Sequence, residues 1–185
     1  MRRTPTRLLG PISLALGLAT ILVSARLNPW FSLTTHAFSD LGGPRASWPW
    51  VFNGGLTISG LTFAAYGALL TKRAPTKGEA LASASTAYTG LFLTLIGLLP
   101  EGNKSHFFVS AWFFAQAWAS MVAWGLALKN KEEYKGVSRT LLVGGSLAPL
   151  GLLAPWPSVA LLEAYALAFI AIWVGALSAC YPPKG

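Results

Sequence analysis

Long apolar runs separated by short polar connections constrain this 185-residue chain more than any other feature. A helix needs about 20 apolar residues to cross the hydrocarbon core of a bilayer, and most of the runs approach or exceed that length. We expect spans at residues 7–26, 47–71, 80–100, 106–128, 139–155 and 158–181. Backbone groups in hydrocarbon must be satisfied within their own segment, and the runs lack the alternating pattern of barrel strands. The sequence therefore predicts an all-α polytopic membrane protein, a six-transmembrane-helix bundle.

Composition agrees with this class. The chain is 54% hydrophobic and only 11% charged, whereas soluble domains carry roughly 25% charged residues. At this length the helices are expected to form a single domain, residues 1–185.

The first run follows Arg2, Arg3 and Arg7, as a signal peptide does, but it is longer than the apolar core of a signal peptide and no A-x-A site follows it. We therefore expect it to remain as a mature helix.

The positive charges are distributed unevenly between the two sides of the predicted bundle. The formal net charge is +8, from 14 basic and 6 acidic residues. Three basic residues fall on one side, namely Arg26, Arg45 and Lys104, and all the others fall on the side of the two termini. The positive-inside rule then places both termini in the cytoplasm of a multi-pass cell-membrane protein. The basic loops are interpreted as topology signals and contacts to membrane lipids, and no nucleic-acid partner is expected.

The first connection on the opposite side, "RLNPWFSLTTHAFSDLGGPRASWPW", differs from the plain basic loops. Asn28-Pro29 is expected to end the opening helix, because proline disfavours helix in the residue before it. Between this point and Gly42-Gly43, aromatic and aliphatic residues alternate with Ser, Thr and His. This pattern predicts a short interfacial helix between the first and second spans.

Scarce ionisable residues gather near the same predicted bilayer surface. Three acids lie outside the basic loops, Asp40, Glu101 and Glu163, and both histidines, His36 and His106, accompany them. Glu163 is expected roughly 7 Å below the outer end of the last helix. An acid at that depth needs a partner, a proton or a water-filled cavity. These residues predict a polar pocket that opens to the extracytoplasmic side.

This pocket favours a lipid-directed hydrolase or transferase. Asp40 or Glu101 is the candidate general base towards water, and His106 is the candidate acid or orienting group. Asn53 is the candidate donor to a developing oxyanion. The candidate substrate-binding residues are Ser39, Asn53, Ser110 and Glu163.

Two other functions remain open on the sequence alone. The same groups can hold a lipid headgroup, an ion or a proton for binding or transport without covalent chemistry. Alternatively, the protein is structural, and the acids pair with Arg26, Arg45 and Lys104 to fix the loops. Single residues also have structural interpretations, since Ser39 or Asp40 can cap a turn and Asn53 can join two helices.

A divalent metal such as zinc is a further alternative, and the cofactor is left open. His36 and Asp40 are spaced i, i+4, which places them on one face if that stretch is helical. Glu101 and His106 can complete a mixed nitrogen and oxygen ligand set. However, the chain has no H-E-x-x-H motif. The lone Cys180 offers neither a disulfide nor a metal cluster.

At these same residues the chain resembles the domain of unknown function family 998, polytopic membrane proteins of archaea and bacteria. The matching stretches are "WFSLTTHAFSDLGG" with "VFNGG", then "GLLPEGNKSHFFVS", then "APWPSVALLE". The family pattern falls on Ser39, Asp40, Gly42, Asn53, Glu101, His106, Ser110 and Glu163, and His36 departs from it. A more distant analogy links "SLTTH" to the intramembrane hydrolases of the alkaline ceramidase and adipoQ receptor type. The resemblance implies a fold and a pocket but no reaction.

Overall fold

The computed structural model describes residues 6–181, and in that range the secondary structure consists of helices with no strand. The long helices are α1 (Thr6–Leu27), α2 (Pro49–Thr71), α3 (Lys77–Leu98), α4 (His106–Leu128), α5 (Lys135–Leu147) and α6 (Val159–Cys180). Three short 3-10 helices join them, η1 (Phe38–Gly42), η2 (Glu132–Tyr134) and η3 (Ala148–Leu153). Six segments are long and apolar enough to cross a membrane, the fifth running from Glu132 to Leu153. The prediction of an all-α, six-span protein is confirmed.

Local signals in the sequence explain where several helices begin. Pro49 opens α2, where a missing backbone N–H costs nothing. Thr76 caps α3 by accepting from the N–H of Glu79, and Ser158 caps α6 by accepting from the N–H of Leu161. Between α3 and α4 the chain reverses at Gly102, whose φ of 95° is a left-handed conformation that favours glycine.

The fifth span differs from its predicted bounds of 139–155. Its α-helix starts earlier, at Lys135, and ends at Leu147, after which the chain continues as η3. Pro149 has no N–H to donate to the carbonyl of Gly145, so the α-helical ladder cannot continue. The indole N–H of Trp118 on α4 bonds that carbonyl instead, at 2.8 Å. The proline therefore changes the helix type, and a neighbouring helix satisfies the freed carbonyl.

The interfacial helix expected in the first connection is not confirmed. After α1 the chain forms turns, and the only helix that the structure describes before α2 is η1, five residues long. The carbonyl of His36 accepts from the N–H of Ala160 at 2.8 Å, which ties the connection to the start of α6. A backbone group of this connection thus bonds to a distant helix, α6.

Glycines bring α2 and α3 into close contact. An added Cβ at Gly67 would lie 2.3 Å from the backbone nitrogen of Ala87, and one at Gly90 would lie 2.2 Å from that of Ala64. Real Cβ atoms do not approach backbone so closely, so these two positions require glycine. Small residues commonly allow membrane helices to pack in this way.

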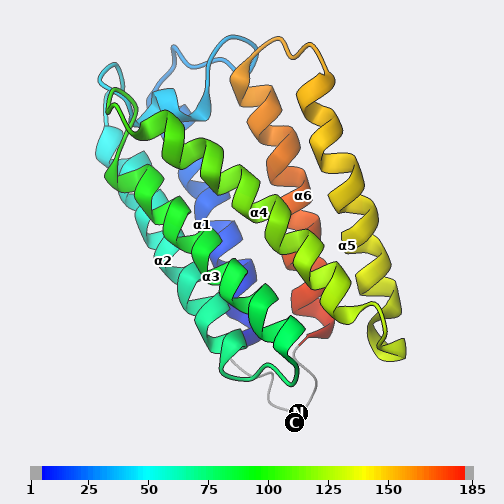
Figure 1. Ribbon diagram of the computed structural model, residues 1–185. Helices are drawn as coiled ribbons and strands as arrows, with labels where there is room; N and C mark the ends of the chain where they lie inside the picture. The colour runs from blue at the N-terminus through cyan, green and yellow to red at the C-terminus, as the bar shows by residue number, and fades with distance from the viewer. Residues whose placement is uncertain (1–5, 182–185) are drawn as a thin grey trace.

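The bundle has two polar ends, which Figure 1 shows at its top and bottom. The η1 end comprises η1, the turn between α3 and α4, and the start of α6. The Glu79 end comprises the turn between α2 and α3, the start of α1, η2 and the end of α6. In Figure 1, α5 lies at the edge of the bundle, beside α4 and α6.

Candidate functional site

The turn between α3 and α4 fixes the histidine of the site. His106 is the first residue of α4 and is buried, and its Nδ1 lies 2.7 Å from the carbonyl oxygen of Leu99. A carbonyl oxygen can only accept, so Nδ1 carries the proton. The other ring nitrogen, Nε2, therefore has a lone pair in the neutral ring and an N–H in the charged ring.

Two side chains meet Nε2 of His106. Glu101 Oε2 lies 3.3 Å away, and the hydroxyl of Ser110, one turn further along α4, also lies 3.3 Å away. Ser39 of η1 donates to the same carboxylate oxygen of Glu101 at 3.4 Å. The glutamate side chain is 43% exposed, whereas that of the histidine is 8% exposed. A histidine and a solvent-accessible carboxylate at this distance can pass a proton between them.

Glu163 approaches the same region from α6. Its Oε2 accepts from the backbone N–H of Phe38 at 2.7 Å, which links the fifth residue of α6 to η1. Asp40 and Glu101 are close enough to interact with it electrostatically. Within residues 6–181, no lysine or arginine forms an ion pair with any of these three carboxylates. The fold thus brings Asp40, Glu101 and Glu163, which are far apart in the sequence, into one region of the structure.

Asp40 and Asn53, two other predicted site residues, form hydrogen bonds within the η1 region. Asp40 Oδ2 accepts from the backbone N–H of Ala37 at 2.9 Å. Asn53 Nδ2 donates to the carbonyl of Gly42 at 2.9 Å and so joins α2 to η1. Neither side chain lines the cavity described below. Both hold the loop that carries Ser39 and the N–H of Phe38.

His36 lies apart from the other candidate metal ligands. Its ring stacks on Phe31 at 5.9 Å and meets the edge of Trp30 at 5.2 Å. The i, i+4 argument for His36 and Asp40 assumed a helix, but η1 begins only at Phe38. Across the described range 6–181, no three His, Cys, Asp or Glu side chains are grouped as metal ligands. The fold does not bring together the set His36, Asp40, Glu101 and His106.

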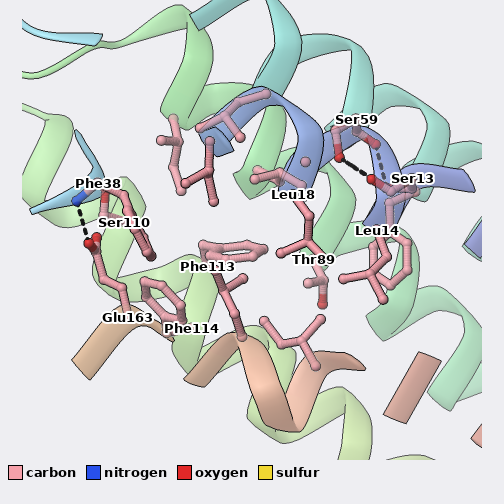
Figure 2. Close-up of a pocket in the computed structure, with 18 of the residues that line it drawn as sticks. Ser13, Leu14, Leu18, Phe38, Ser59, Thr89, Ser110, Phe113, Phe114 and Glu163 are labelled. Carbon is pink, nitrogen blue, oxygen red and sulfur yellow. Dashed lines mark hydrogen bonds between the residues drawn. The ribbon is translucent and has the colours of Figure 1, made fainter. Parts of the chain in front are cut away.

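A cavity runs from Ser39, Ser110 and Glu163 into the bundle. Glu101 and His106 do not line it but contact Ser39 and Ser110, which do. The empty volume in this region is about 800 Å³, a figure that includes open solvent at the mouth of the cavity. Figure 2 shows Glu163, Ser110 and Phe38 at one end and Ser13 and Ser59 towards the other. Apart from Ser39, Ser110 and Glu163 near η1, the lining is mostly aliphatic and aromatic and comes from α1, α2, α3, α4 and α6. Leu18 of α1 belongs to this lining and is 40% exposed.

The hydroxyls in the deep part of the cavity already have partners. Ser13 Oγ donates to the carbonyl of Ser59 at 2.8 Å, and Ser59 Oγ donates to that of Ser13 at 2.8 Å. Thr89 Oγ1 donates to the carbonyl of Ser85 at 3.1 Å. These residues leave no unpaired donor in the wall. The deep part is therefore suited to a hydrocarbon chain.

Sequence reasoning found the polar residues near the cavity but missed its apolar wall. The wall residues Phe63, Phe113 and Leu167 look like any others in long apolar helices. The only local signals are Ser13 and Gly17, which interrupt the aliphatic pattern of α1 on the cavity side. Such small residues are more common at plain helix contacts.

Comparison with known proteins identifies the family. Residues 11–179 match the family model described as Protein of unknown function (DUF998). Neither the curated proteins nor the solved structures contain a significant match. The matched range includes all the polar residues of the site and the entire cavity lining. The chain belongs to the DUF998 family.

Proposed function

We propose that this protein is a lipid-directed hydrolase or transferase that takes the hydrocarbon chain of its substrate into the cavity. The observation that carries the proposal is the shape of the cavity wall, apolar along its depth and polar where Ser39, Ser110 and Glu163 meet. A lipid has the same division between chain and head. Ligand pockets are typically apolar with a few polar groups that fix orientation.

The chemistry is assigned to the Glu101 and His106 pair. In a hydrolysis, the carboxylate of Glu101 takes a proton from water, and the resulting hydroxide attacks the ester or amide carbonyl of the lipid. Glu101 passes this proton to the lone pair on Nε2 of His106, 3.3 Å away, and Nε2–H then gives it to the leaving group as the bond to that group breaks. Between the two candidate bases the geometry favours Glu101, because the carboxylate of Asp40 accepts from the N–H of Ala37.

The remaining polar residues would bind the head. Glu163 and Ser110 line the cavity and offer an acceptor and a hydroxyl, and Ser39 lines it beside Glu101. The side-chain amide of Asn53 has two N–H groups, and one of them donates to the carbonyl of Gly42. Only the second N–H can therefore donate to an oxyanion. A head that carries hydroxyl or amino donors suits this set of acceptors.

We also propose that the η1 end faces the extracytoplasmic side of the cell membrane. Lys72, Arg73, Lys129 and Lys131 all lie in the connections at the Glu79 end, and the positive-inside rule puts that end in the cytoplasm. Membrane lipids are then the partners of the protein, and the substrate comes from the outer leaflet.

Binding or transport without chemistry is the second candidate function. It is favoured by the hydrogen bond of Asn53 to Gly42, which leaves few donors for a developing oxyanion. In that case the same cavity holds the lipid, and the Glu101 and His106 pair only contacts its head. The two functions differ in whether a product forms.

The test uses purified protein in lipid nanodiscs with monoacylglycerol, and a total membrane lipid extract as a second probe. Fatty acid release and lipid binding are both followed by mass spectrometry. Under the proposal the wild type forms product, and Glu101→Gln or His106→Gln lowers the rate about 10²- to 10⁴-fold while the fold is kept. Glu132→Gln is the matched control, because that side chain is 85% exposed at the other end.

Each result separates the candidates. Lipid binding without product from either probe supports the binding protein over the enzyme. Product formation that survives Glu101→Gln rejects the assigned base. A wild type that neither binds nor converts lipid from either probe rejects both functions.

A further inference from the structure

We propose that the cavity selects lipids by chain length and that Phe63 forms the floor that sets the limit. This inference rests on the proposed function, because it names the class of lipid that the same cavity takes. The preferred substrate would have one hydrocarbon chain no longer than the distance from Glu163 to that floor.

The floor is a cluster of aromatic rings. Phe63 is the deepest α2 residue of the cavity lining and is 4% exposed. The ring of Trp173 meets it edge-on at 5.5 Å, and that of Tyr66 lies 5.9 Å away. Aromatic pairs at such distances and angles stabilise one another, so the three rings form a packed layer at this depth.

The bundle is closed beyond the floor. Tyr66 packs directly against α1, since an added Cβ at Gly10 would lie 2.9 Å from its ring. The hydroxyl of Tyr66 also reaches Ser178 of α6 at 3.4 Å. Helices α1, α2 and α6 thus meet below Phe63, whereas above it the cavity lies between α6 and the pair α1 and α2, which stay in contact at Ser13 and Ser59. A chain that reaches Phe63 has to stop there.

The depth of the cavity matches one leaflet. Glu163 and Val174 are the first and last lining residues on α6, and at 1.5 Å per residue they are about 16 Å apart. The hydrocarbon core of a bilayer is about 30 Å thick, so one leaflet contributes about half of that. The depth of the lining along α6 is therefore close to the length that one leaflet offers to a lipid chain.

The experiment measures binding of monoalkylglycerol ethers of graded chain length. Ethers of this kind are not cleaved by a hydrolase of esters or amides, so binding is observed without turnover. For the wild type in nanodiscs, native mass spectrometry should show an affinity, referred to the free concentration of the ether in water, that rises about fourfold per added methylene until the chain reaches the floor. Beyond that length the affinity should no longer rise.

Two variants move the floor in opposite directions. Phe63→Ala should let the rise in affinity continue to longer chains. Val174→Phe, which adds a ring at the same depth, should stop the rise at shorter chains. Phe107→Ala is the matched control, because Phe107 is 83% exposed and should leave the limiting length unchanged.

The outcomes distinguish this inference from the proposed function. If the wild type binds the ethers and both variants keep its limiting length, the floor is not at Phe63 and the inference is overturned. If the wild type binds no ether, the proposed function fails together with the inference. If Phe63→Ala does not fold, Val174→Phe decides alone. A shorter limiting chain length in that variant supports a floor at Phe63, and an unchanged limiting length overturns the inference.

Discussion

Two glutamates at opposite ends of the bundle, one buried and one half-buried, have opposite surroundings. Glu79, near the start of α3, is fully buried, and both of its carboxylate oxygens accept from Nζ of Lys131, at 2.9 and 3.0 Å. Thr76 Oγ1 donates to it as well, at 2.6 Å. Glu163 accepts one backbone N–H and has no cation in ion-pair contact within residues 6–181. Burial of an acid therefore does not by itself mark a functional site.

The difference lies in what surrounds each carboxylate. Around Glu79 the structure is closed, with Tyr181 packed against Trp124 at 4.7 Å and Tyr134 at 5.8 Å. Burial, and the nearby carboxylate of Glu79, raise the pKa of Tyr181, so its hydroxyl stays protonated and adds no second negative charge. Glu163 instead lines a cavity. A carboxylate that is left without a cation beside empty space is the better candidate for contact with a ligand.

The largest effect is expected from breaking the pair at the Glu79 end. Lys131→Met leaves a buried carboxylate without its cation, which should lower the free energy of unfolding by about 3 kcal/mol. Unfolding in mixed detergent micelles measures the loss. Lys135→Met is the matched control, because the Lys135 and Glu132 pair is exposed and should contribute under about 0.5 kcal/mol. Equal stability of the two variants contradicts a structural role for Glu79.

Removing both charges of the Glu79 and Lys131 pair tests whether the stability loss in Lys131→Met comes from the unpaired carboxylate. In the double variant Glu79→Gln with Lys131→Met, no buried charge remains, and the amide oxygen can still accept from Thr76. We expect about 2 kcal/mol of the loss in Lys131→Met to be recovered, because an unpaired buried charge costs more than the pair contributes. The same unfolding titration on the four members of the cycle measures this coupling. A double variant less stable than Lys131→Met would contradict it.

Sequence reasoning succeeded where the signals are local. The spans follow from apolar runs with proline, serine and threonine at their starts, and all of them match helical segments of the structure. Glu101, His106 and Ser110 were expected together because a turn and one helical repeat connect them. Glu163 was placed near them because it falls just inside the same predicted bilayer surface and acids are rare in this chain. In the structure, Glu163 accepts a hydrogen bond from the N–H of Phe38, the residue before Ser39.

The parts that sequence reasoning could not supply depend on packing between distant helices. The cavity exists because helices α1 to α4 and α6 leave space between them, and no single helix encodes that space. The first connection was expected to contain a helix in the membrane interface, but its backbone groups bond α6 and its own turns. That difference also separates His36 from Asp40, since their shared face required the helix.

At the η1 end, loss of the charge should affect binding more than folding. Glu163→Gln keeps an oxygen that accepts from the N–H of Phe38, so unfolding should become easier by about 1 kcal/mol or less. Binding of a monoalkylglycerol ether should weaken about tenfold, because a hydroxyl donor loses a charged acceptor. Native mass spectrometry and unfolding of the same sample compare the two effects. A stability loss as large as that of Lys131→Met, with binding unchanged, would make Glu163 a structural residue.

The smallest effects are expected from the three basic residues of the η1 end. If the acids there served only to fix the loops, replacing their partners would cost as much as Lys131→Met. Within the described residues, however, Arg26, Arg45 and Lys104 form no ion pair, and Arg45 lies over the ring of Trp30 at 4.7 Å. Arg26→Gln and Lys104→Gln should therefore change the free energy of unfolding by less than about 0.5 kcal/mol, and Arg45→Gln by about 1 kcal/mol at most. A loss near 3 kcal/mol in any of the three, measured in the same titration as Lys131→Met, would show that the two ends are held by the same kind of ion pair.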